Sequence, residues 1–247
     1  MMMRNKRDEK KDEIWMSDNR MSGVTCTTDN RVFSRWSNIG RNVYNAAGSK
    51  YYVEPIQGCV NDCYFIAALA SGAWAANSKL KTHPNYRFYK TTAPAGWGAW
   101  FTINDDLPVD TTGNLVYARS SSLYIWPCLY EKAYAVWKAG GNQTPVIGTV
   151  LNGGNGLDAL LNIFGGVVTQ GTFIFDAAAG NKTKYPSVAK ASNTNTIGLT
   201  KNHTYSVLRK TAAGIELRNP CGGAIITVPS ASFTAVNFSE WGYVIPA

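Results

Sequence analysis

Residues 57–69 are Gln57-Gly58-Cys59-Val60-Asn61-Asp62-Cys63-Tyr64-Phe65-Ile66-Ala67-Ala68-Leu69. The Asn61-Asp62 pair indicates a turn, and the apolar run after it predicts a helix over residues 64–76, with Cys63 where this helix opens. Free backbone N–H groups in the first turn of a helix stabilise negative charge, so a thiol placed there can have a pKa well below its ordinary ~8.5. Cys63 is therefore a candidate nucleophile. Asp62 is interpreted as the helix N-cap, with a charge that slightly opposes a neighbouring thiolate.

A cysteine nucleophile needs a proton acceptor, and the chain contains only two histidines, His83 and His203. Alternating residues after His203 predict a strand, and a second strand ends at Asn219, with Gly214 in the turn between them. A hairpin of this kind brings His203 and Asn219 together, so the Asn side-chain oxygen can accept the imidazole N–H and orient the ring. His203 follows Cys63 within the roughly 130–150 residues that separate such pairs in known cysteine enzymes. His83 lies in a polar segment and is expected to be a solvated loop residue.

Five segments in the same order resemble the protease core of the calpain family of papain-like cysteine peptidases. The family's nucleophile block, Gln-Gly followed by Asp-Cys and an aromatic pair, is similar to residues 57–70. Its histidine block resembles residues 202–207, and its Arg-Asn-Pro-Trp-Gly block resembles residues 218–222. Residues 104–110 and 129–135 are similar to an Asp-rich turn and a Leu-Glu-Lys-Ala-Tyr-Ala helix of the same family.

The resemblance implies a role for four residues. Cys63 would be the nucleophile, His203 the general base and then the general acid, and Asn219 the residue that orients His203. Gln57 would donate its side-chain N–H to the oxyanion together with the Cys63 backbone N–H, and such donors are each worth about 10²–10³ in rate. The chain would then be a calpain-like cysteine endopeptidase, a thiol protease that hydrolyses protein or peptide substrates.

The expected fold class is α+β, with the papain-like arrangement of a helical half and a β-sheet half that enclose the active-site cleft. Residues 1–45 are expected to form a polar tail and entry segment. Residues 46–166 form the helix-rich subdomain with Cys63, and residues 167–247 the β-rich subdomain with His203 and Asn219. Helices are predicted at 64–76, 126–138 and 157–164, strands at 167–175, 204–209, 215–217, 225–228 and 241–245, and a loop at 93–103.

Two departures from the family pattern concern calcium and solvent. A calcium ion takes six to eight oxygen ligands, and Glu240 is the only acidic residue after Asn219. Glu54 matches a family calcium-ligand position and is the one weak candidate, with a surface charge or an arginine partner as the alternative. We therefore expect no cofactor and calcium-independent activity. Cys221 stands where the family has tryptophan, which predicts a more solvated His203–Asn219 pair.

Composition limits the classes of function. The chain has 247 residues, of which 45% are hydrophobic and 16% charged, enough for one catalytic unit with a substantial core. No run reaches the roughly 20 apolar residues of a membrane span, and the charged start predicts no secretory signal, so a cytoplasmic location is expected. The net charge of +8 is scattered, which argues against nucleic-acid binding. The other cysteines, Cys26, Cys59, Cys128 and Cys221, are expected to be spectator thiols.

Two other classes of function remain open at this stage. A calpain-like domain without catalysis could serve as a protein-interaction module, which would account for the missing tryptophan but not for the retained Cys63, His203, Asn219 and Gln57. A papain-like acyltransferase of the transglutaminase type uses the same nucleophile chemistry but usually orients its histidine with Asp.

Overall fold

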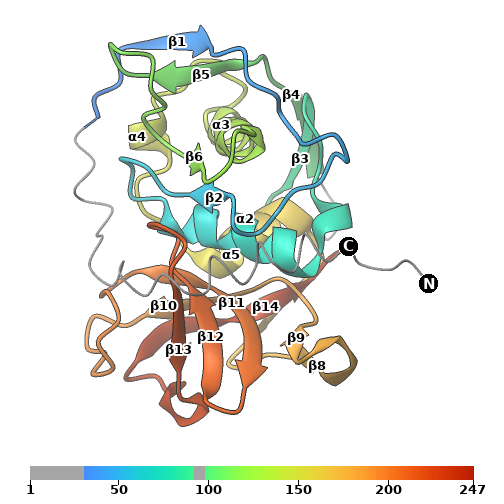
Figure 1. The fold of residues 1–247 in the computed structure, drawn as a ribbon, viewed down its shortest axis with the longest axis vertical. Coiled ribbons are helices and arrows are strands. Elements are labelled where there is room, and N and C mark those ends of the chain that lie inside the picture. The colour runs from blue at the N-terminus through green and yellow to red at the C-terminus, as the bar shows by residue number, and fades with distance from the viewer. Residues whose placement is uncertain (1–30, 92–97) are drawn as a thin grey trace.

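The computed structural model of the chain describes residues 31–91 and 98–247. The part with four α-helices and several short strands lies on one side, and one large antiparallel sheet lies on the other (Figure 1). The architecture is α+β. The α-helices are α2 (Cys63–Ala75), α3 (Trp126–Lys138), α4 (Ile147–Val150) and α5 (Gly156–Phe164), and the 3₁₀ turns are η3 (Asn77–Lys79), η4 (Ala177–Ala179) and η5 (Ser230–Ser232).

The large sheet has eight strands in the order β13-β12-β11-β10-β14-β7, and the small β9 and β8 attach beside β11. Each of its pairs is antiparallel. Its strands are β7 (Val167–Gln170), β8 (Phe175–Asp176), β9 (Lys182–Thr183), β10 (Ser187–Ala191), β11 (Thr204–Thr211), β12 (Gly214–Arg218), β13 (Ile225–Val228) and β14 (Phe238–Ile245).

Three two-stranded sheets surround the helices. β1 (Arg35–Asn38) pairs with β5 (Asp106–Val109), β2 (Pro55–Ile56) with β6 (Arg119–Ser120), and β3 (Asn85–Tyr89) with β4 (Gly98–Thr102).

Local sequence explains where the longer helices begin and end. The α3 helix has a proline in its first turn, where no backbone donor is needed, and a lysine in its last turn. Asn155 caps α5, because its side chain accepts the Asp158 N–H at 2.8 Å. Glu240 adds to this cap by accepting the N–H groups of Gly156 and Leu157, each at 3.0 Å.

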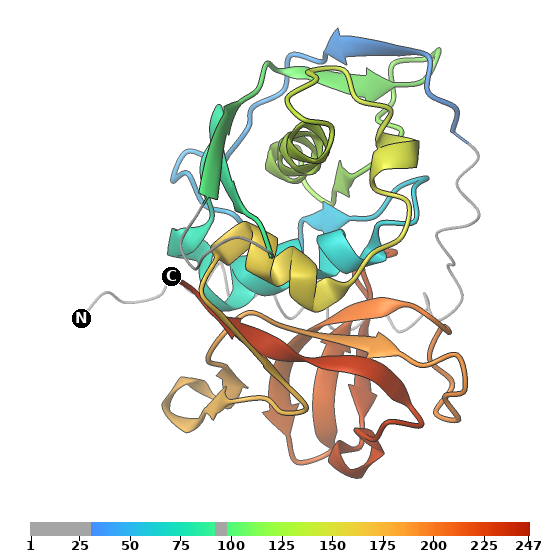
Figure 2. The same ribbon diagram turned by 180° about the vertical axis from the view of Figure 1, so that it is seen from behind.

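The α2 helix lies between the two parts of the molecule, and α5 runs beside it above the sheet (Figure 2). Ser206 on β11 donates its hydroxyl to the Ala67 carbonyl at 2.7 Å, and the Ser71 hydroxyl accepts the Ser187 N–H at 2.6 Å. The Trp74 indole donates to Leu208 O at 2.7 Å. These bonds fix α2 to β10 and β11 along its length.

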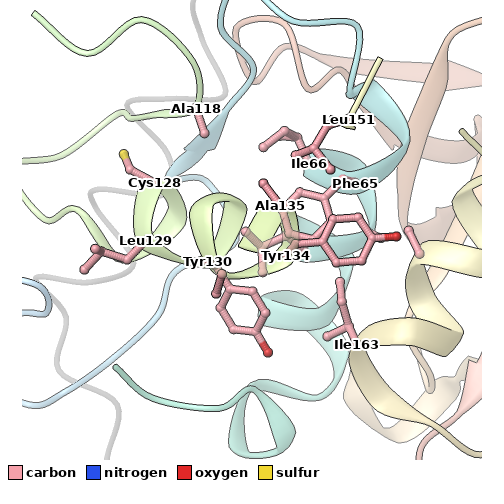
Figure 3. Packing of buried hydrophobic residues seen from close by; sticks show 14 of the residues in the cluster. Phe65, Ile66, Ala118, Cys128, Leu129, Tyr130, Tyr134, Ala135, Leu151 and Ile163 are labelled. Carbon is pink, nitrogen blue, oxygen red and sulfur yellow. The ribbon is translucent and has the colours of Figure 1, made fainter. Parts of the chain in front are cut away.

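The main core lies around α2 and α3 (Figure 3). Phe65 of α2 stacks on Tyr134 of α3, with ring centroids 4.4 Å apart. Stacked aromatic pairs of this type stabilise by about 0.5–1.5 kcal/mol beyond the area that they bury. A second hydrophobic core lies in the β-sheet part and includes Tyr205, Val207, Leu217 and Phe238.

Some predicted elements agree with the structure and others do not. The helix at 126–138 and the strand at 225–228 are confirmed with the predicted bounds. The predicted loop at 93–103 is wrong at 98–102, which is strand β4, because Trp100 and its neighbours pair with β3; residues 92–97 lie outside the described residues. The expected entry segment contributes β1, and its residues 1–30 are also outside the described part. Within the described ranges, no helix is long and apolar enough to cross a membrane.

Candidate active site

The predicted helix start is confirmed, because Cys63 is the first residue of α2. The Asp62 carbonyl accepts the N–H groups of Phe65 at 2.8 Å and Ile66 at 3.1 Å, which begins the helix. Asp62 occupies the N-cap position as expected, but its side chain makes no capping hydrogen bond.

The segment before the helix is held by a close backbone approach. A Cβ atom at Gly58 would lie 1.8 Å from the Tyr117 carbonyl oxygen, so only glycine fits there. The Cys59 N–H donates to Val116 O at 3.2 Å in the same region. Gly58 therefore lets the chain between Gln57 and Cys63 lie against residues 116–117.

The predicted hairpin of β11 and β12 brings His203 and Asn219 together. Ser206 is opposite Arg218 in its register, so the residues that flank the paired strands meet at one end. His203 Nε2 lies 2.9 Å from Asn219 Oδ1, and the same oxygen accepts the Cys221 N–H at 2.9 Å. The Tyr205 ring meets the imidazole edge to face at 4.9 Å. With Nε2 turned to Asn219, the ring nitrogen left for a thiol is Nδ1.

Burial and the hydrogen bond act in opposite directions on His203. The side chain is 8% exposed, and burial lowers the pKa of the imidazole although the bond to Asn219 raises it. The more solvated pair that the Cys221 position predicts is therefore wrong for His203. A neutral imidazole at neutral pH is the form that can accept a proton.

Gln57 is tied to the turn that carries Asn219. Its backbone N–H donates to Pro220 O at 2.9 Å, and its side-chain amide donates to Val60 O at 2.7 Å. An amide group has two N–H donors, so one remains for another acceptor. Arg218 strengthens the same connection, because its buried guanidinium donates to Val53 O at 2.9 Å and Pro55 O at 2.7 Å.

The Cys63 thiol differs from the expectation for a helix N-terminus. The residue is 5% exposed, and burial raises the pKa of the thiol, with the Asp62 charge adding to the rise. The backbone and hydroxyl of Thr204, and the charge of Lys190, lower this pKa without offsetting the burial. Within the described residues, no hydrogen bond joins Cys63 to His203, and Thr204 is the group that faces the sulfur.

Cys221 is not the spectator thiol that the sequence predicts, because it is disulfide-bonded. Its sulfur lies 3.7 Å from His203 Nε2 and 3.3 Å from Gln57 Oε1. Cys59 and Cys128 are free thiols, and Cys26 lies outside the described residues. A sulfur atom therefore covers the imidazole where the family pattern has an indole.

Glu54, the weak calcium candidate, is buried rather than a surface charge. Its carboxylate accepts the Ser122 hydroxyl at 2.6 Å, the Tyr51 N–H at 3.0 Å and the Trp126 indole N–H. These neutral donors take the place of the arginine partner considered from the sequence. In the described ranges, no group of three or more His, Cys, Asp and Glu side chains is placed to hold a metal ion.

His83 is not the solvated loop residue expected from its polar surroundings. It lies between η3 and β3, and its Nε2 is 2.6 Å from Asp105 Oδ1. Its side chain is 12% exposed, so a partner carboxylate replaces water.

Sequence reasoning missed Glu131, which the structure places against Asp62. Glu131 is 1% exposed on α3, and both of its carboxylate oxygens lie 3.0 Å from the Ala118 N. The sequence did contain a signal that Glu131 is buried. Glu131 lies three residues after Cys128 and four before Ala135, on an apolar face of a predicted helix.

The family assignment rests on a match between residues 28–227 and the model of the calpain family cysteine proteases, which covers most of the chain. The chain belongs to this family. Over 186 residues it is 32% identical to mouse Calpain-5, and over 198 residues 27% identical to human Calpain-14. Each of these matches covers 67% of this chain and 27% of the relative, so the chain spans about a quarter of their length. A shorter match to rat Calpain-13 is 36% identical over 125 residues and covers 46% of this chain and 17% of the relative.

Proposed function

We propose that this chain is a cysteine endopeptidase that cleaves protein substrates through an acyl-enzyme on Cys63. The observation that carries the proposal is the 2.9 Å contact between His203 Nε2 and Asn219 Oδ1, on a hairpin whose strand β11 is hydrogen-bonded to the Cys63 helix. Papain-like enzymes place these groups on the two walls of a cleft, and we extend that arrangement to this chain. Family membership supports the same class of reaction.

The proposed reaction assigns each proton to a residue. Cys63 gives its thiol proton to His203 Nδ1, and the thiolate attacks the substrate carbonyl carbon. The oxyanion accepts hydrogen bonds from the Cys63 backbone N–H and from the second N–H of the Gln57 amide. His203 then protonates the leaving amine, and the acyl group remains on sulfur as a thioester. Water, which gives a proton to His203, attacks the thioester and releases the acid and the thiol.

Asn219 acts on the imidazole in this scheme. It accepts the Nε2 proton, which fixes the tautomer that has a free lone pair on Nδ1. Its hydrogen bond raises the pKa of His203, which partly counters the effect of burial when the ring becomes charged.

The conditions of the reaction follow from the residues near the site. We propose activity without calcium or another cofactor, because the carboxylates of Glu54 and Glu240 already accept hydrogen bonds from neighbouring protein groups. Protein or peptide substrates, no nucleic acid or membrane partner, and a cytoplasmic location complete the proposal.

A second candidate is a catalytically inactive interaction module of the same fold. The observation in its favour is the Cys63 thiol, whose pKa is raised by burial and which, within the described residues, has no hydrogen bond to His203. A thiol of this kind is a poor nucleophile at neutral pH.

Alkylation of each cysteine at a series of pH values, read by mass spectrometry, separates the two candidates. The peptidase predicts that substrate-like peptidyl alkylating agents react with Cys63 far faster than with Cys59, and that His203→Ala removes the advantage. Cleavage of unstructured protein substrates, with and without a calcium chelator, completes the test. Equal alkylation of the two thiols together with no cleavage would establish the inactive module.

A further inference from the structure

Two fully buried carboxyl groups meet behind the candidate nucleophile. Asp62 is 0% exposed and precedes Cys63, and Glu131 is 1% exposed in the second turn of α3. Neither has a Lys or Arg partner among the residues that the structure describes. Two unpaired negative charges in such a place would be very costly, so the pair cannot be doubly ionised at neutral pH.

The two carboxyl groups can form a hydrogen bond with each other only when one of them is protonated. Glu131 accepts the Ala118 N–H with both oxygens, at 3.0 Å each. Both Asp62 oxygens are buried and, in the described part of the chain, accept no N–H or O–H donor. Ionised carboxylates are acceptors only, so the contact between Asp62 and Glu131 becomes a hydrogen bond when one of them is protonated.

Burial sets the pH range in which this proton can leave. Burial, offset only in part by the bond to Glu131, raises the pKa of the Asp62 carboxyl to about 7. Burial and then the Asp62 charge raise the pKa of Glu131 well above its ordinary value. One proton is therefore held on the pair through neutral pH, and a second is lost near pH 7.

Several titratable groups surround the Asp62–Glu131 pair, and the charge of the pair is the one that changes near pH 7. Asp62 raises the pKa of Cys63 and Tyr64 on α2, and Glu131 raises that of Cys128 on α3 and of Tyr117. These are thiols and phenols, which are neutral at pH 7. The cations are Lys190, which acts on Cys63, and Arg41 and Arg119, which act on Cys128.

The pair also supports the first turn of the Cys63 helix. The Asp62 carbonyl starts α2, and Glu131 joins α3 to Ala118, whose position beside the start of α3 is visible in Figure 3. The Phe65–Tyr134 stack fixes the two helices one turn further on. Asp62 therefore connects Glu131 to the residue next to it, Cys63.

We propose that Asp62 and Glu131 share a proton and that this pair controls how readily the Cys63 thiol ionises, with Glu131 as a positioning residue that holds the Asp62 charge. The inference rests on the proposed role of Cys63 as nucleophile. Loss of the proton from Asp62 places a negative charge beside the sulfur and makes it less reactive at higher pH. Glu131 touches neither substrate nor thiol and acts through Asp62.

The test is alkylation of Cys63 by a small neutral reagent in the His203→Ala variant, which lacks the titrating imidazole. The rate is followed from about pH 5.5 to about pH 8.5, which covers the ~7 to 8.5 range of the groups concerned. With Asp62 and Glu131 unchanged, the rate in this His203→Ala background should rise with pH and bend downward near pH 7. Asp62→Asn should remove the bend and raise the rate above it by about tenfold, one pKa unit. Glu131→Leu removes the bond that lowers the pKa of Asp62 but leaves Asp62 buried, so the bend should remain and move to higher pH.

A purely structural role predicts another pattern, in which both variants change the rate in the same direction at every pH. That result, or a parent profile without a bend, overturns the proposal. Carboxyl carbon NMR of the unmutated protein gives a second test that needs no folded variant: one Asp, and one Glu besides Glu240, whose pKa burial also raises, should titrate above the ordinary ~4. Titration of all carboxyls near 4 also refutes it. Neither readout depends on peptide cleavage, so failure of the proposed peptidase activity is seen separately.

Discussion

The histidine side and the cysteine side of the candidate site differ in how their polar groups are satisfied. On the histidine side, His203 Nε2 and the Cys221 N–H meet one Asn219 oxygen, and the Gln57 N–H meets Pro220 O. On the cysteine side, neither Asp62 oxygen accepts an N–H donor within the described residues, and the Thr204 hydroxyl has no nitrogen or oxygen partner there, although it faces the Cys63 sulfur. The proposed base is thus held in one orientation, while the surroundings of the Cys63 thiol raise its pKa and favour its protonated form.

The difference locates the control of the site. A preorganised base gains little from further adjustment, because its orientation is already fixed. A buried thiol beside a titratable carboxyl changes with every charge placed near it. Substrate binding or a change of charge on the cysteine side is therefore the step that would set the activity.

The largest expected effect comes from removing the nucleophile. Cys63→Ala should lower peptide cleavage by more than about 10⁴-fold, since loss of a nucleophile in comparable enzymes costs up to about 10⁶. The thermal midpoint should change little, because alanine fits a buried helical position. Cys59→Ala serves as the control and should retain cleavage. Equal activity of the two variants would move the chemistry away from the cysteine side.

Removing the acceptor on the histidine side should have the next largest effect. Asn219→Ala leaves His203 Nε2 and the Cys221 N–H without their acceptor, and kcat should fall by between about 10² and 10⁴. Because the Asn219 bond raises the pKa of His203, its loss should lower that pKa and move the acid limb of kcat/KM to lower pH. Asn219→Asp supplies a charge that raises the pKa of His203 and should move the limb the other way. An unmoved limb in both variants would contradict the assigned pairing.

The amide that joins the two sides should matter to a smaller degree. Gln57→Ala should lower kcat by about 10²–10³, as loss of one oxyanion donor does elsewhere, with KM nearly unchanged. Gln57→Glu keeps the size of the side chain and removes both N–H donors, so it should be equally slow. A normal rate in Gln57→Glu would show that the oxyanion is bound by other groups.

The close backbone approach at Gly58 predicts an effect on stability. Gly58→Ala would bring Cβ within 1.8 Å of Tyr117 O, and the free energy of unfolding should fall by about 2 kcal/mol or more. Gly148→Ala is a matched control on α4, where the nearest atom to the added Cβ is 3.4 Å away. Urea unfolding of the two variants, followed by tryptophan fluorescence, measures the contrast. Similar midpoints would mean that the segment before Cys63 is free to move away from Tyr117.

The smallest effect is expected at the end of the hairpin remote from His203. Arg209 Nε donates to Glu216 Oε2 at 2.7 Å, and the side chains are 33% and 14% exposed. Glu216→Gln should reduce the free energy of unfolding by less than about 1 kcal/mol, with no change in cleavage. A change in cleavage would show that the far end of the hairpin controls the position of His203.

The sequence predicted the elements with a strong local pattern. The α3 helix has apolar residues at helical spacing, and the β11–β12 hairpin has alternating strands around Gly214. The central strand β10, Ser187–Ala191, was missed because its small residues carry little of the β-branched or aromatic signal of a strand. Family membership and the α+β class followed from motifs that retain their order along the chain.

The cysteine side could not be predicted in the same way. The contact of Asp62 with Glu131 joins two helices far apart in the sequence. Glu131 lies on the apolar face of a predicted helix, but Asp62 carries no local sign of burial. The direction of the Cys63 pKa depends on that burial, which outweighs the helix terminus. On the histidine side, by contrast, a short hairpin determines which residues meet.

The disulfide at Cys221 has a practical consequence for anyone who purifies this protein. Thiol reductants are added to keep a nucleophilic cysteine in its reduced form, yet here the same reagent can open a bond whose sulfur lies 3.7 Å from the imidazole. Preparations made with and without reductant will differ at both Cys63 and Cys221. Activities are therefore comparable only between samples whose thiols have been counted.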